Sequence, residues 1–132
     1  MQERLRTEAT ASMAQATGGA NTFGDQQLAA DIFAERTLMA ALQGKCAVFS
    51  SEESPEEVTM GGSSLCVVSD PLDGSSILGA NLTVGTIFGV FPGRALVGCT
   101  GRDCLAAGYA LYGPRTELAV AVQEAPGVPS SC

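Results

Sequence analysis

Four short apolar runs, each of the length of a β-strand, divide this chain and limit it to a fold built on a sheet. They are rich in Val, Ile, Leu and Phe, and they occupy residues 46–49, 65–68, 83–91 and 116–122. Acidic, glycine or proline residues bound them, which is the pattern expected of strands separated by turns. The polar segment between the first two runs, residues 54–64, predicts an exposed connection.

The clearest helical pattern precedes the first apolar run. Its apolar residues recur near helical spacing at Leu28, Ile32, Met39 and Leu42. Gly44 predicts the end of this helix, and either Asp25 or Asp31 would cap its beginning. A second helix is predicted over residues 102–112. The resulting order of helices and strands predicts an α/β fold, a layered mixed sheet flanked by helices.

The length of 132 residues is that of one domain, which we place at residues 21–124. Residues 1–16 have helix-forming composition with a sparse apolar stripe, and the glycine-containing segment that follows predicts a mobile loop up to residue 20. Residues 125–132 are rich in Pro and Ser and are predicted to form a disordered tail.

The net charge of −7, with seven Lys and Arg residues and no run of them, argues against nucleic acid or an anionic membrane as a partner. No stretch approaches the roughly 20 apolar residues of a membrane span. The sequence is therefore interpreted as soluble and intracellular. A phosphorylated substrate remains compatible with the charge, because divalent cations neutralise clustered carboxylates and then attract phosphate.

The chain contains five cysteines and no histidine. An odd number of cysteines without C-x-x-C spacing argues against a zinc site or a disulfide framework. Cys46 and Cys66 lie inside apolar runs and are interpreted as small buried hydrophobic residues. The absence of histidine also removes the usual Ser-His and Cys-His nucleophile arrangements.

The sequence DPLDGSS at residues 70–76 is the strongest candidate for a chemical site. Asp70, Asp73 and the intervening Leu72 carbonyl could supply three oxygen ligands to Mg²⁺. The next three residues, Gly74, Ser75 and Ser76, then offer backbone N–H groups and two hydroxyls to a phosphate. The alternative interpretation is an ordinary surface turn, because Asp, Pro, Gly and Ser are all turn residues.

Two further carboxylates favour the metal site. Glu52 and Glu53 follow the first apolar run, and pairing of that strand with the next, parallel or antiparallel, would bring them beside Asp70 and Asp73. Four carboxylates at one sheet edge would repel one another without cations. The later acidic pair at residues 56–57 is interpreted as part of a solvated loop.

Several of these segments together resemble the class I fructose-bisphosphatase and sedoheptulose-bisphosphatase family. The matching segments are Gly24-Asp25 with Asp31, residues 51–53, residues 70–76 and residues 84–90. Ile77 and the runs at residues 100–103 and 112–116 look more like the sedoheptulose branch. The resemblance covers residues 21–122 and implies the N-terminal domain of a sugar phosphatase.

The resemblance implies a role for each candidate residue. Mg²⁺ would be bound by Glu52, Asp70, Asp73, the Leu72 carbonyl and Asp25. The attacking water would be oriented and deprotonated by Asp31 and Glu53, and the phosphate would be held by Asp73, Gly74, Ser75 and Ser76. The implied reaction is hydrolysis of the C1 phosphate of sedoheptulose-1,7- or fructose-1,6-bisphosphate, in which metal-activated water replaces a protein nucleophile.

The resemblance also sets expectations beyond the site. Family members extend past residue 132, and the further part supplies another metal ligand and most residues that grip the sugar. A catalytically incomplete fragment or interaction module is therefore one alternative, and an inositol-monophosphatase-type phosphatase is another. The family implies a homo-oligomer, with a chloroplast stroma location and a Calvin cycle role for the sedoheptulose branch and the cytoplasm otherwise.

Overall fold

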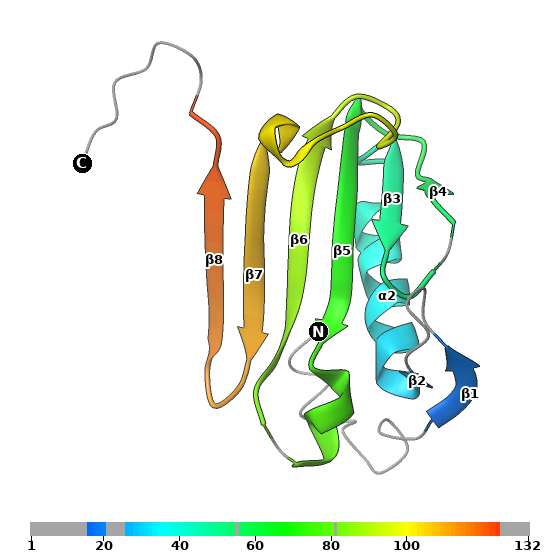
Figure 1. The fold of residues 1–132 in the computed structure, drawn as a ribbon, viewed down its shortest axis with the longest axis vertical. Helices are drawn as coiled ribbons and strands as arrows, with labels where there is room; N and C mark the ends of the chain where they lie inside the picture. The colour runs from blue at the N-terminus through cyan, green and yellow to red at the C-terminus, as the bar shows by residue number, and fades with distance from the viewer. Residues whose placement is uncertain (1–15, 21–25, 55, 81, 125–132) are drawn as a thin grey trace.

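A six-stranded mixed sheet forms the centre of the computed structural model, which describes residues 16–20, 26–54, 56–80 and 82–124 (Figure 1). The strand order is β4-β3-β5-β6-β7-β8, with β3 and β5 parallel and all other neighbours antiparallel. The strands are β3 (Val48–Ser51), β4 (Val58–Thr59), β5 (Leu65–Asp73), β6 (Val84–Pro92), β7 (Ala106–Tyr112) and β8 (Thr116–Val122). The predicted mixed sheet is confirmed.

Smaller elements surround this sheet. A separate antiparallel pair is formed by β1 (Ala16–Ala20) and β2 (Gln26–Leu28). Two short 3₁₀ helices, η1 (Ser75–Ala80) and η2 (Gly101–Asp103), lie after β5 and before β7. Residues 17–20, which we expected in a mobile loop, are thus in a strand. The predictions for residues 1–15 and 125–132 lie outside the described residues.

The α-helix α2 (Ala29–Leu42) covers one face of the sheet at β3 and β5 (Figure 1). Its N-terminus is capped by Asp31, whose Oδ2 accepts a 2.7 Å hydrogen bond from the Leu28 N–H. This carboxylate accepts a hydrogen bond from one of the backbone N–H groups at the start of the helix that have no partner within the helix. The predicted helix is confirmed, and Asp31 is one of the two candidate caps, while the other, Asp25, lies outside the described residues.

The main apolar cluster lies between α2 and the sheet. Phe49, fully buried, packs with Cys46, Met60 and Val67, and three helix residues cover them, Leu38, Met39 and Leu42. Cys66 is also fully buried, as predicted for both cysteines, and burial raises the pKa of its thiol. The segment predicted as an exposed connection departs from that expectation, because it contributes β4 and the buried Met60.

The predicted helix over residues 102–112 is wrong, since these residues form η2 and β7. Alanine and leucine favour a helix locally, but β7 pairs along its whole length with β6 and β8. Gly108 marks a point where the neighbouring strands approach β7 closely. A Cβ there would lie 2.8 Å from the Phe88 ring, so the ring occupies space that only glycine leaves free.

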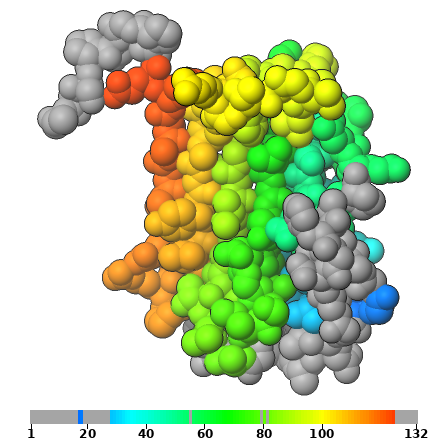
Figure 2. Space-filling view, viewed as in Figure 1, coloured from blue at the N-terminus to red at the C-terminus, as the bar shows by residue number. Residues whose placement is uncertain are grey.

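The strand β8 forms one edge of the sheet (Figures 1 and 2). Leu118, Val120 and Val122 alternate along one face of it and are 68%, 51% and 71% exposed. The sheet therefore presents apolar side chains beyond the part that α2 covers. Among the described residues, no helix is both long and apolar enough to cross a membrane.

Candidate active site

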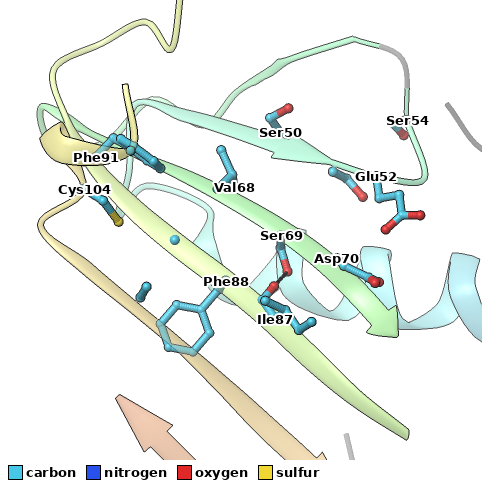
Figure 3. A pocket seen from close by; sticks show the side chains of 14 residues that line it. Ser50, Glu52, Ser54, Val68, Ser69, Asp70, Ile87, Phe88, Phe91 and Cys104 are labelled. Carbon is cyan, nitrogen blue, oxygen red and sulfur yellow. Dashed lines mark hydrogen bonds between the residues drawn. The ribbon is translucent and has the colours of Figure 1, made fainter. Parts of the chain in front are cut away.

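The parallel pairing of β3 with β5 stops just before two acidic residues, while β5 itself continues to Asp73. Ser51 of β3 is in register with Ser69 of β5, and the Glu52 N–H continues the ladder with a 3.0 Å bond to the Ser69 carbonyl. Glu52 and Asp70 therefore lie side by side, with their carboxyl groups close together (Figure 3). The prediction that pairing of these two strands would bring the acidic residues together is confirmed for this pair.

The environment of Asp70 disfavours its charged form. The pKa of Asp70 is raised to about 7, and burial is the largest cause. The Glu52 carboxyl contributes to this rise by its charge and by a hydrogen bond between the two side chains, and Asp73 adds a smaller repulsion. The Leu72 N–H, which donates to Asp70 Oδ1 at 3.0 Å, acts in the opposite direction. A cation at this place would offset the burial and the repulsion that disfavour the charged form of Asp70.

A β-bulge brings Asp73 to the same face of the sheet as Asp70. Asp70 lies opposite Ile87 and Asp73 opposite Gly85, so Pro71 and Leu72 together face the single residue Thr86. In a regular strand, residues three apart point to opposite faces. The extra residue in the bulge places Asp70 and Asp73 on the same face. The buried Leu72 side chain packs on the other face, in the cluster with Ala30, Ala34 and Val84.

The turn after β5 depends on Gly74. Its φ of +80° lies in the left-handed region that other residues resist. The Gly74 carbonyl accepts a 3.0 Å hydrogen bond from the Ile77 N–H, and Ser75 begins η1. The structure thus places the predicted phosphate-binding residues directly after the two aspartates, with Asp73 and Ser76 exposed.

The two predicted water-activating residues lie near the same end of the sheet. Asp31 is at the N-terminus of α2, which begins beyond the end of β3 and near the end of β5 (Figure 1). It is 2% exposed, and its Oδ1 has no hydrogen-bond partner among the described residues. A buried, unpaired carboxylate oxygen calls for a ligand or water. Glu53 is half-buried, and its N–H donates to Ser51 Oγ at 3.1 Å.

A divalent cation fits the chemistry of this end of the sheet. Glu52 and Asp70 offer hard oxygen ligands in close contact, which Mg²⁺ prefers. Within the described ranges, however, no three acidic, cysteine or histidine residues come close enough to hold a metal ion. Asp25, the remaining predicted ligand, lies outside the described residues. The described part of the chain therefore provides two adjacent ligands rather than a complete shell.

A cavity of about 690 Å³ opens beside these carboxylates (Figure 3). Glu52, Ser54 and Asp70 line one part of it, and Val68 and Phe91 line another. It lies on the face away from α2, because the neighbouring Val67 packs against the helix and successive strand residues face opposite sides. The volume is within the range of small-molecule sites.

The raised pKa of Asp70 predicts a pH-dependent stability in the absence of divalent cations. Because the pKa in the folded chain, about 7, exceeds the ordinary 3.8, the folded state binds more protons between these values. The free energy of unfolding of the wild type relative to Asp70→Asn should therefore fall as pH rises from about 4 to about 7 and then level off. Urea unfolding at several pH values measures this difference.

Asp103→Asn is a control variant, because the pKa of the carboxyl that it removes is lowered by folding, whereas that of Asp70 is raised. The Thr100 N–H and hydroxyl, 2.7 and 2.8 Å from Asp103 Oδ2, lower the pKa of that exposed carboxyl. Its contribution should be complete above about pH 4 and be lost only as the pH falls further. The raised pKa of Asp70 would be contradicted if the difference in the free energy of unfolding between the wild type and Asp70→Asn stayed constant between pH 4 and 7.

Three residues around the bulge were not identified from the sequence. Ser69 Oγ donates to the Ile87 carbonyl at 2.7 Å, and Thr86 and Tyr112 form a hydrogen-bonded pair beneath Pro71. The available signal was Pro71 itself. Proline within a strand indicates a bulge or an edge, because it cannot donate to the ladder.

Comparison with known proteins identifies relatives of this arrangement. Residues 1–130 match the domain family described as Fructose-1-6-bisphosphatase, N-terminal domain. The chloroplastic sedoheptulose-1,7-bisphosphatase of Chlamydomonas reinhardtii is 50% identical over 133 aligned positions, covering 96% of this chain and 34% of that protein. Fructose-1,6-bisphosphatase class 1 2 of Cereibacter sphaeroides is 43% identical over 105 positions, 76% of this chain and 32% of that protein.

A solved structure agrees with this relationship. The holo form of Leishmania major fructose-1,6-bisphosphatase superposes with a TM-score of 0.81 at 28% identity, covering 92% of this chain and 43% of that one. The fold is therefore shared. This chain spans about a third of the length of the curated relatives that it matches.

Proposed function

The chain belongs to the fructose-1,6-bisphosphatase family, and we propose that it carries the metal-binding half of a site that hydrolyses the C1 phosphate of a ketose bisphosphate. The observation that supports this most is the contact between Glu52 and Asp70, just past the last paired residues of the parallel strands β3 and β5. Sedoheptulose-1,7-bisphosphate is the proposed substrate, because plastid sedoheptulose-1,7-bisphosphatases are among the most similar relatives.

Mg²⁺ is the proposed cofactor, and when bound it would stabilise charge on the transferring phosphoryl group and lower the pKa of water. Glu52, Asp70 and Asp73 would hold it, with the Leu72 carbonyl and Asp25 as further ligands. The raised pKa of Asp70 supports a cation at this place, since a positive charge would offset the repulsion between the carboxyls.

The remaining residues act on water and phosphate in this proposal. Asp31 and Glu53 would orient the attacking water and accept its proton, a role compatible with the unpaired Oδ1 of Asp31. Gly74, Ser75 and Ser76 would hold the phosphate with backbone N–H groups and hydroxyls. No protein nucleophile is required, which agrees with a sequence that contains no histidine.

A catalytically incomplete chain is the second candidate. It is favoured by the coverage of about a third of the relatives' length and by a described site with two adjacent ligands rather than three. In that case the chain would act only together with a polypeptide that supplies the sugar-binding groups. The family match favours a sugar bisphosphate over an inositol monophosphate. A chloroplast stroma location is proposed from the names of the plastid relatives, and a homo-oligomer from the family resemblance alone.

Phosphate release from sedoheptulose-1,7- and fructose-1,6-bisphosphate, measured with Mg²⁺ and with EDTA, separates these candidates. We expect little or no turnover from the 132-residue chain by itself. Robust turnover that persists in EDTA would contradict the metal mechanism. Robust turnover that requires Mg²⁺ would keep the mechanism and reject the view that sugar-binding groups lie elsewhere.

A further inference from the structure

Two hydroxyl groups, those of the buried Thr86 and the half-buried Tyr112, hold the β-bulge that carries the proposed metal-binding aspartates. Thr86 is 4% exposed, and its Oγ1 lies 2.8 Å from the Pro71 carbonyl and 2.8 Å from the Tyr112 hydroxyl. A carbonyl only accepts, so the single hydroxyl hydrogen of Thr86 is directed to Pro71. Tyr112 must then donate to Thr86, which fixes the direction of both bonds.

This chain of hydrogen bonds crosses three strands. It begins at Tyr112 at the end of β7, passes through Thr86 of β6 and ends on Pro71 of β5. A bulge interrupts the backbone ladder locally, so the pairing of β5 with β6 holds this segment less firmly than a regular strand. The Thr86 hydroxyl is aimed at the one point where the ladder is irregular.

The Tyr112 ring contributes packing to the same place. It lies against the apolar cluster that contains Leu72 and Val84, which flank the bulge from both strands. The side chain thus packs beside the bulge through its ring and hydrogen-bonds to Thr86 through its hydroxyl. Replacing Tyr112 by Phe removes the hydrogen bond and keeps the ring.

We infer that Thr86 and Tyr112 are positioning residues, which set the separation of Asp70 and Asp73 by fixing the bulge between them. This inference rests on the proposed function, because it assigns the aspartates to a metal. A hydroxyl pair with a purely structural role would stabilise the fold without affecting cation binding, so the two roles are separable by experiment.

The test is a titration of the full chain with Mg²⁺, followed by backbone amide NMR, together with amide hydrogen exchange of residues 70–76. Thr86→Val and Tyr112→Phe should weaken Mg²⁺ binding about 10-fold to 100-fold, the range for groups that orient metal ligands. Both should also speed exchange in the turn. Thr86→Ser, which keeps the hydroxyl, should restore both properties to within about 2-fold of the wild type.

Thr37→Val is the matched control. Thr37 Oγ1 also donates to a backbone carbonyl at 2.8 Å, that of Phe33, but it lies in the middle of α2. This variant should lose a hydrogen bond and leave Mg²⁺ binding and turn exchange unchanged. Equal effects of Thr37→Val and Thr86→Val, or wild-type behaviour of both Thr86→Val and Tyr112→Phe, would overturn the inference.

The outcomes separate this inference from the proposed function. If the wild-type chain binds no Mg²⁺, the metal assignment fails. Faster turn exchange in Thr86→Val and Tyr112→Phe, but not in Thr37→Val, would then still support the fixing of the bulge. If Thr86→Val does not fold, Tyr112→Phe and Thr86→Ser decide the question, because each changes fewer atoms of the buried site.

Discussion

Replacing Glu52 by Gln is expected to weaken Mg²⁺ binding by at least about 100-fold, since loss of groups that only orient ligands already costs about 10-fold to 100-fold. Gln keeps the size of the side chain and removes the charge that faces Asp70. Without a cation, removing one of the two carboxyls removes the electrostatic repulsion between them. The variant should therefore unfold at the same temperature as the wild type or at a higher one. Calorimetric titration and thermal unfolding measure the two effects.

Glu56→Gln is the matched control for this prediction. Glu56 is exposed in the segment between β3 and β4, and it undergoes the same chemical change. Its removal alters the net charge equally, so any effect through the overall field should appear in both variants. Equal weakening of Mg²⁺ binding by Glu52→Gln and Glu56→Gln would show that the chain attracts cations only through its negative charge.

Replacing Phe49 by Ala is expected to lower the free energy of unfolding by about 3–5 kcal/mol. Phe49 is fully buried between α2 and the sheet, where its ring fills the main apolar cluster. The loss is a large part of the about 5–15 kcal/mol typical of a domain, and should lower the melting temperature by about 10–20 °C. Urea unfolding of both proteins measures it.

Tyr109→Ala removes an aromatic ring of similar size from an exposed position. Tyr109 is 45% exposed on β7, opposite Ala119 of β8. The expected loss is about 1 kcal/mol or less, the range for cross-strand contacts at a surface. If Phe49→Ala costs no more than Tyr109→Ala, the apolar cluster beneath α2 is not the principal core.

Local sequence patterns were sufficient to predict the main helix and the edge strand β8. The helix from Ala29 to Leu42 has its apolar residues at near-helical spacing, and β8 has β-branched residues bounded by a turn. Helix prediction failed over residues 102–112 because long-range pairing with two neighbouring strands decides the conformation there. No local propensity contains that information.

In the candidate site, too, some features were predictable from local sequence and others depend on long-range pairing. The sequence placed Glu52 and Asp70 at strand ends, and their contact followed once the strands paired. It did not show how two aspartates three residues apart reach one face, because that requires the bulge opposite Thr86. The hydroxyls that hold the bulge come from β6 and β7, far along the chain, so only the folded structure brings them to Pro71.

The most direct test of the metal site is a titration of the wild-type chain with Mg²⁺, followed by its backbone amide NMR signals. We predict saturable shifts that are largest at residues 51–53 and 70–74, the segments that contain the carboxylates and the bulge. These shifts should be absent in Glu52→Gln. No saturable shift, or shifts centred on the exposed acidic residues 56–57, would contradict the assignment of Glu52 and Asp70 as a divalent cation site.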